Sequence, residues 1–164
     1  MPIYRRALPI RHMNLHENLA ALLSEQGLEL RELPADTGTA EQAAAAVGVP
    51  TASIVKSLVL TADGNGILVL ASGDRRVDLE RLKDILRIGD LRMATAAQAK
   101  AFTGFAIGGV PPLGHAETLP SYFDRRLLDH ATVYAAAGTR HRLFAIQPER
   151  LLAMTRATVV DFEG

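Results

Sequence analysis

Two apolar runs near the middle of the chain predict the centre of a β-sheet. Residues 54–60 and 67–71 consist almost entirely of Ile, Val, Leu and Ala, and the sequence Asp-Gly-Asn-Gly at 63–66 separates them. Two such runs joined by a Gly/Asn/Asp turn are typical of a β-hairpin. Their nearly unbroken apolarity indicates strands covered on both faces, so we expect this hairpin to be the most buried part of the chain.

Five further segments have the start signals of helices. Four of them begin with a side chain that can accept a hydrogen bond from the first helical turn, namely Asn14, Thr39, Asp78 and Thr95. Thr39 and Thr95 are each followed by a glutamine three residues later, which is the capping-box pattern. Glycines at 27, 48 and 104 mark three of the helix ends, and Pro148 starts a short fifth helix at a favoured position.

Short β-rich runs at 28–33, 118–123, 131–136, 142–146 and 157–162 predict the remaining strands. Helices and strands therefore alternate with hairpins, which indicates an α+β fold: a single domain with a mixed, mostly antiparallel β-sheet surrounded by helices. A chain of 164 residues fits one such domain. We place the domain at residues 14–164 and treat residues 1–13, which are basic and broken by prolines, as an N-terminal extension.

Composition excludes several classes of site and partner. The chain has no cysteine, and its five histidines do not have metal-ligand spacing, so we expect no metal and no other cofactor. The 18 basic and 18 acidic side chains give zero formal net charge, which argues against a DNA-binding protein and limits any RNA contact to a local one. With no apolar run long enough to span a bilayer, we expect no membrane contact and a cytoplasmic location.

Two features are candidates for chemistry. The loop at residues 105–115 packs three glycines and two prolines between apolar runs, so it should be rigid and irregular, with backbone N–H groups able to bind an anion or oxyanion. Lys56 interrupts a strand that is otherwise apolar. Its ammonium group either extends from the sheet edge to water or lies at the floor of a pocket, where it would face a phosphate, carboxylate or oxyanion.

Taken together, these features resemble the YbaK-like family of aminoacyl-tRNA deacylases, which are related to the editing domain of bacterial prolyl-tRNA synthetases. The resemblance is carried in order by the Lys56 strand, the helix starting at Asp78, the loop sequence Gly-Gly-Val-Pro-Pro-Leu-Gly-His at 108–115, and the strand that ends at Gly138. It implies hydrolysis of the ester that joins a wrong amino acid to the 3′ acceptor end of a tRNA. Prolyl-tRNA synthetase is a candidate partner.

The resemblance also implies roles for individual residues. Lys56 would contact the tRNA end, and Gly108 and Gly109 would supply backbone groups around the reacting carbonyl. We expect the surrounding pocket to include Pro112, Gly114, His115, Gly138 and Thr37. A bound water would attack the ester without a covalent intermediate, because an activated ester needs mainly positioning and oxyanion stabilisation.

The identity of the amino acid is less constrained. Members of the family that remove cysteine tend to have a glycine and then an aspartate after the Gly138 turn, where this chain has His141 and Leu143. This difference favours a small residue such as alanine on tRNA-Pro, with cysteine, serine and threonine less favoured. Two other functions remain open: a non-catalytic tRNA- or synthetase-binding module of the same fold, and an esterase that acts on small molecules.

Overall fold

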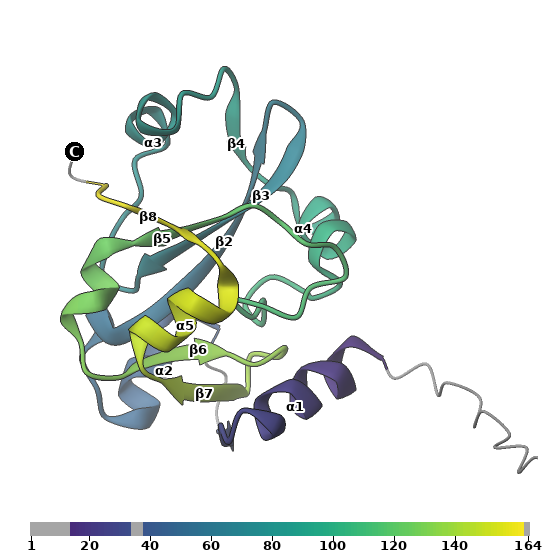
Figure 1. Cartoon of the computed structure of the whole chain (residues 1–164), viewed down its shortest axis with the longest axis vertical. Helices are drawn as coiled ribbons and strands as arrows, with labels where there is room; N and C mark the ends of the chain where they lie inside the picture. The colour runs from purple at the N-terminus through teal and green to yellow at the C-terminus, as the bar shows by residue number, and fades with distance from the viewer. Residues whose placement is uncertain (1–13, 34–37, 163–164) are drawn as a thin grey trace, which may run out of the picture.

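The computed structural model of the chain describes residues 14–33 and 38–162. Its helices, shown in Figure 1, are α1 (Leu15–Glu25), α2 (Ala40–Val47), α3 (Leu79–Leu86), α4 (Ala96–Thr103) and α5 (Pro148–Thr155). Its strands are β1 (Leu30–Glu32), β2 (Ile54–Ala62), β3 (Asn65–Ser72), β4 (Leu91–Met93), β5 (Ser121–Asp124), β6 (Val133–Ala136), β7 (Arg142–Ile146) and β8 (Thr158–Val160). The α+β class expected from the sequence is confirmed.

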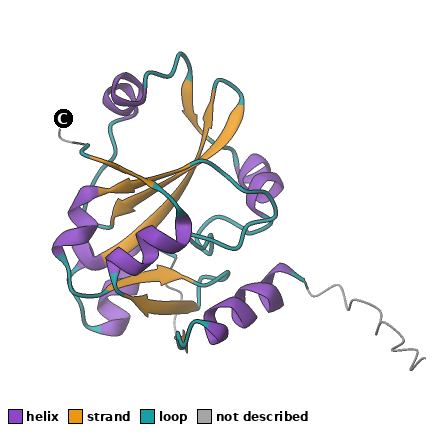
Figure 2. Cartoon of the chain, in the orientation of Figure 1, coloured by secondary structure: helices purple, strands orange, loops and turns teal. Residues whose placement is uncertain are grey.

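The strands form one mixed sheet in the order β1-β7-β6-β2-β3-β5-β8, with β4 paired to β2 outside this path. Antiparallel pairs outnumber parallel ones, as expected: β1–β7, β2–β3, β2–β4 and β6–β7 are antiparallel, whereas β2–β6, β3–β5 and β5–β8 are parallel. Figure 2 shows the sheet running through the molecule with the helices around it. None of the described helices is long and apolar enough to cross a membrane.

The helix starts predicted from the sequence are present. The Asn14 side chain accepts a hydrogen bond from the N–H of Glu17, and Asp78 accepts from the N–H groups of Glu80 and Arg81. Both capping boxes form completely, Thr39 with Gln42 and Thr95 with Gln98. Because each cap satisfies orphan N–H groups locally, these boundaries depend on nearby sequence alone.

The β2–β3 hairpin lies at the centre of the sheet and is covered on both faces. Val59 and Leu68 pack into one hydrophobic cluster with Phe105, Phe123 and other buried residues. Their neighbours Leu60 and Val69 point the other way, into a second cluster beneath α3. This division follows from the alternation of side chains along a strand, and it confirms the expected burial on both sides.

One edge of β2 is only partly paired. Along that edge β6 pairs with Ile54 and Val55, and β4 pairs with residues 60–62. An additional hydrogen bond joins the N–H of Ala94 to the carbonyl of Val59, at 3.0 Å. No described strand pairs with residues 56–58 on this edge, so the sheet has a gap there that includes Lys56.

The sequence Asp-Arg-Arg at 124–126 predicts an exposed charged turn, and Asp129 before His130 predicts the start of a strand; both predictions are wrong. The segment at Asp124 is not an exposed charged turn: Asp124 is 0% exposed, and its carboxylate accepts hydrogen bonds from the N–H groups of Ser72 and Arg126 and from Arg75 Nε. Asp129 ends a short 3₁₀-helix instead of starting a strand. Strand β4 was not anticipated, because three residues are too few to show a periodic pattern.

Candidate active site

The gap beside β2 opens into a cavity of about 340 Å³, which we call the edge cavity. Its walls come from the start of α2, from residues 54–58 of β2, from the loop residues Ile107, Gly108 and Val110, and from Ala136 and Leu143. A missing strand, together with small side chains on α2 and glycine in the loop, leaves this space unfilled. Lys56 and Gly108, which are far apart in the sequence, thus line one cavity.

Lys56 is half-buried at this cavity. Its Nζ donates a hydrogen bond to the carbonyl oxygen of Arg75, at 3.0 Å. An ammonium group has three donor hydrogens, so this contact orients the amine and leaves donors for a ligand. Of the two alternatives left open by the sequence, the geometry matches the pocket lysine.

The loop is held in place by backbone contacts. The Gly109 N–H donates to the carbonyl of Ala106, and the carbonyl of Gly109 accepts from the N–H of Gly138, both at 3.0 Å. A Cβ on Gly109 would lie only 2.7 Å from the Gly138 oxygen, so the two glycines pack backbone to backbone. Gly109 therefore has its amide already engaged, whereas the N–H groups of Gly108 and Val110 have no hydrogen-bond partner in the described part of the chain.

Four other residues named from the sequence do not line the edge cavity. Pro112, Gly114, His115 and Gly138 are not among the described residues that line the edge cavity. The carbonyl of Pro111 is 2.6 Å from His115 Nε2, and the His115 ring packs edge-on against Phe105. Burial lowers the pKa of His115 below its ordinary value of 6.5, although the bond to Pro111 opposes this. The neutral ring can then donate to that carbonyl and brace the loop.

Sequence reasoning did not name Ser57 or Ile107 as site residues, and it named Arg140 only as a candidate tRNA contact on a basic turn. Ser57 and Ile107 line the edge cavity, and Arg140 packs against two lining glycines. The Arg140 side chain lies 3.1 Å from an added Cβ at Gly38 and 2.7 Å from one at Gly108. A cation is thus held beside the cavity. Thr37, which was also predicted to line the pocket, lies outside the described residues.

A smaller chamber of about 70 Å³ adjoins the edge cavity and shares several of its walls. Both are lined by Ser57, Leu58, Ile107, Gly108 and Val110, and the chamber extends toward Val59, Met93, Ala94 and Ala99. We call it the side chamber. Apart from Ser57 and Gly108, the residues that line it have apolar side chains.

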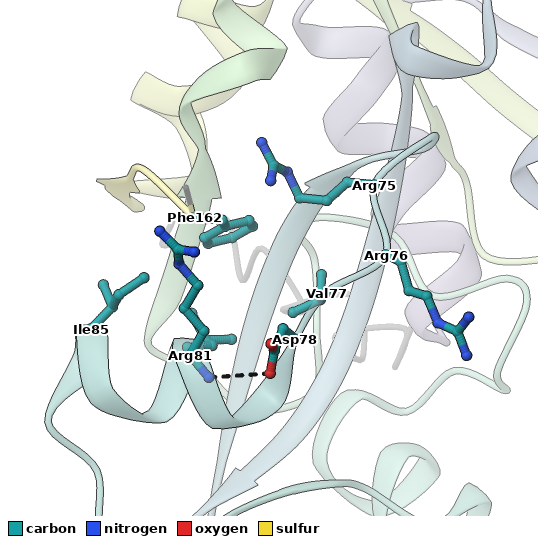
Figure 3. A pocket seen from close by; sticks show the side chains of 8 residues that line it. Arg75, Arg76, Val77, Asp78, Arg81, Ile85 and Phe162 are labelled. Atoms are coloured by element: carbon teal, nitrogen blue, oxygen red, sulfur yellow. Dashed lines mark hydrogen bonds between the residues drawn. The ribbon is translucent and has the colours of Figure 1, made fainter. Parts of the chain in front are cut away.

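A third cavity, of about 200 Å³, lies beside α3 and is lined by Arg75, Arg76, Arg81 and Phe162 among others. In this arginine pocket, shown in Figure 3, the guanidinium groups of Arg75 and Arg81 lie near the Phe162 ring and that of Arg76 points away. The Arg75 Cζ is 5.4 Å from the ring centroid, and its Nε pairs with Asp124 at 2.9 Å. The sequence leaves open whether Arg75, Arg76, Arg140 and Arg142 share one rim that contacts tRNA. In the structure Arg75 and Arg76 line the arginine pocket, Arg140 does not line it, and Arg142 pairs with Glu32.

The part of the chain that the structure describes contains no group of three or more His, Asp or Glu side chains placed to hold a metal ion. The lining of the edge cavity supplies an ammonium group on Lys56, backbone amides, the hydroxyl-bearing residues Thr39 and Ser57, and the carboxylate-bearing Glu41. Such a set can bind a phosphate or ribose oxygen and stabilise a tetrahedral oxyanion, while a bound water serves as the nucleophile.

Comparisons with known proteins agree with this description. The model of the aminoacyl-tRNA editing domain matches residues 34–154. The uncharacterized protein YwhH of Bacillus subtilis (strain 168) is 32% identical over 124 residues, which are 75% of this chain and 78% of YwhH. A crystal structure described as a candidate trans-editing enzyme for prolyl-tRNA synthetase shares 43% identity and a TM-score of 0.82, covering 91% of this chain and 96% of that one.

A third relative is the proline–tRNA ligase of Solidesulfovibrio magneticus, which is 40% identical over 90 residues. The aligned region is 54% of this chain and only 15% of the ligase. This chain thus corresponds to a small part of that much longer protein.

Proposed function

Because the chain belongs to the aminoacyl-tRNA editing family, whose members hydrolyse mischarged tRNA, we propose that its edge cavity binds the aminoacylated 3′ end of a tRNA and hydrolyses the ester there. The observation that carries this proposal is that Lys56 and Gly108 line the same cavity. The amino acid removed is small, such as alanine, serine or threonine, and tRNA-Pro is the proposed carrier. Prolyl-tRNA synthetase, which would supply the mischarged product, is the proposed partner.

The loop would stabilise the oxyanion. When water attacks the ester carbonyl, the carbonyl oxygen gains negative charge, which nearby N–H groups can stabilise. Gly108 and Val110 both line the cavity and have amides without a partner in the described chain, so they are the proposed donors. Gly109, with its N–H on Ala106, would hold the loop against Gly138 instead.

Lys56 would orient the nucleotide. Its ammonium group is fixed at one side by the Arg75 carbonyl and can bind a phosphate or ribose oxygen of the terminal adenosine with its other hydrogens. Arg140, which packs against Gly38 and Gly108, adds a second positive charge at the rim. Two positioned cations are compatible with the zero net charge of the chain, because the proposed contact involves only the tRNA terminus.

Deacylation assays test this function directly. We expect the protein to hydrolyse tRNA-Pro charged with at least one of alanine, serine, threonine or cysteine and to leave prolyl-tRNA-Pro intact. Uncharged tRNA-Pro in excess should compete. Stability of every mischarged tRNA in the presence of the protein would contradict the proposal and favour a binding module, whereas hydrolysis that uncharged tRNA does not inhibit would favour a small-molecule esterase.

A further inference from the structure

Two side chains of the arginine pocket carry a charge that the described chain does not neutralise. Arg76 and Arg81 line this pocket and are exposed. Neither guanidinium group makes a hydrogen bond or an ion pair with the part of the chain that the structure describes. Other arginines do have a carboxylate partner, in the pairs Arg75–Asp124, Arg92–Asp90, Arg125–Asp161, Arg126–Asp74 and Arg142–Glu32.

The charge left in the pocket matches that of one phosphodiester. Asp78 supplies the one carboxylate among the described residues that line the pocket, and its Oδ1 already accepts from the N–H groups of Glu80 and Arg81. The three arginines of the lining, set against Asp78 and the buried Asp124, leave one positive charge in excess. Each phosphodiester of a nucleic acid carries one negative charge, and a guanidinium group binds phosphate oxygens well.

Lys56 connects the arginine pocket with the edge cavity. It lines the edge cavity, and its Nζ donates to the carbonyl of Arg75, which lines the arginine pocket. Side chains alternate along β2, so Lys56 lies on the same face as Leu58 and Leu60, which pack in one cluster with Leu82 of α3. The two cavities therefore lie on one face of the sheet. A strand of RNA whose last nucleotide contacts Lys56 can reach the arginines with the phosphates that precede it.

We propose that the arginine pocket binds the phosphodiester backbone at the single-stranded 3′ end of the tRNA. This inference rests on the proposed function, which places the terminal adenosine in the edge cavity. The guanidinium group of Arg81 lies near the Phe162 ring, whereas that of Arg76 points away from it (Figure 3). The two arginines thus contact different phosphates along the strand. Such contacts position the tRNA without reading its sequence.

The first test compares a substrate that has phosphodiesters with one that lacks them. We would measure kcat/KM at low salt on a mischarged tRNA-Pro and on adenosine esterified with the same amino acid. Arg81→Ala should lower kcat/KM on the tRNA by about tenfold and leave that on aminoacyl-adenosine within about twofold. Arg76→Ala should have the same selective effect. Arg81→Lys, which keeps the charge, should recover most of the loss.

Binding of uncharged tRNA-Pro gives a second measurement, which does not depend on catalysis. Each phosphate contact with a single strand contributes about 0.7 to the slope of log K against log salt. The double variant Arg76→Ala/Arg81→Ala should therefore reduce the magnitude of this slope by about 1.4. Because neither guanidinium group bonds to a described residue, the Tm should stay at the wild-type value.

Arg156→Ala is the matched control. Arg156 is exposed at the end of α5, has no ion pair with a described residue and lines none of the three cavities. This variant should behave like the wild type in both measurements.

Three results would overturn the proposal. An unchanged rate and salt slope in the double variant would show that the arginines do not contact tRNA. Equal losses on tRNA and on aminoacyl-adenosine would show that they act on the edge cavity and not on the phosphates. Loss of binding to prolyl-tRNA synthetase, with tRNA binding unchanged, would assign the pocket to a protein surface. The deacylase function survives all three, and it fails separately if the wild type binds tRNA through these arginines but hydrolyses no aminoacyl ester.

Discussion

The edge cavity and the arginine pocket lie near each other but are built in opposite ways. The edge cavity exists because no described strand pairs with residues 56–58 of β2 on the edge away from β3, and because glycines and alanines form part of its walls. The arginine pocket is lined by three arginines and Asp78 together with four apolar side chains. At its centre Arg75 is already paired with the buried carboxylate of Asp124.

The two cavities differ in what their positively charged side chains do. Arg75 forms an ion pair that stabilises the fold, whereas Lys56 has hydrogen-bond donors left for a ligand. Arg75 uses its guanidinium group on Asp124 and the Phe162 ring, and its carbonyl on Lys56. The Lys56 ammonium, in contrast, bonds to a backbone carbonyl and not to a carboxylate. An abundance of arginines is therefore a weaker sign of a catalytic site than one lysine beside unpaired backbone. Substitutions in the two regions should accordingly affect different measurements.

The largest expected effect is on stability, at the arginine pocket. Asp124→Ala removes the buried partner of Arg75 and two acceptors for backbone N–H groups, so the free energy of unfolding should fall by about 3 kcal/mol or more. Urea denaturation measures this loss. Arg92→Ala, which removes a pair between exposed side chains, is the control and should change stability by less than about 1 kcal/mol. A near-native stability for Asp124→Ala would show that Arg75 is not structurally required.

The next largest effect is on catalysis, at the edge cavity. Lys56→Ala should lower the single-turnover rate of deacylation by about 100-fold with little change in Tm, because the amine would no longer orient the substrate. Lys100→Ala, at an exposed position on α4, should behave like the wild type. An unaltered rate in Lys56→Ala would exclude the amine from the mechanism.

A smaller effect on activity is expected from a substitution at Gly108 in the loop at residues 105–115. Gly108 has a φ of +93°, and a Cβ there would lie 2.7 Å from Arg140 Nε, so Gly108→Ala should disturb both the loop amide and the rim cation. We expect a loss of about tenfold in kcat/KM and of about 1 kcal/mol in stability. Gly27→Ala is a matched control: Gly27 has a φ of +70° with open space around it. It should lose similar stability and no activity.

The smallest effect concerns the pH dependence of stability and His115, whose ring bonds to the Pro111 carbonyl in the loop. Burial lowers the pKa of His115, so the folded protein binds fewer protons than the unfolded chain as the pH falls below about 6.5. The stability contributed by neutral His115 is thus complete above that pH and declines below it, toward the lower pKa of the folded state. His115→Gln should lack this component when unfolding free energies are compared between pH 5 and 8. Identical pH profiles would place His115 in a solvent-like setting.

The sequence predicted what depends on neighbouring residues. Caps at Asn14 and Thr39 and the turn of the central hairpin were found because their partners lie within a few positions. Asp124 was misplaced because its partner, Arg75, is distant in the sequence. Strand β4 was missed because it consists of three residues held by pairing with β2.

The candidate site was predictable only in part. Lys56 was identified because a charge in an apolar strand is conspicuous, and Gly108 because of the loop composition and the family resemblance. Ser57 was not, because a serine in a strand is ordinary until the open edge and the cavity beside it are known. Arg140 was a candidate tRNA contact from the sequence, but its place beside the cavity follows only from the packing of the β6–β7 turn against Gly108.

The most direct test of the account is a crystal structure with a non-hydrolysable 3′-aminoacylamino-adenosine. We predict that the adenosine analogue occupies the edge cavity, with its amide oxygen toward the N–H groups of Gly108 and Val110 and an adenosine oxygen on Lys56 Nζ. Binding of the analogue in the arginine pocket, with the edge cavity left unfilled, would contradict the account.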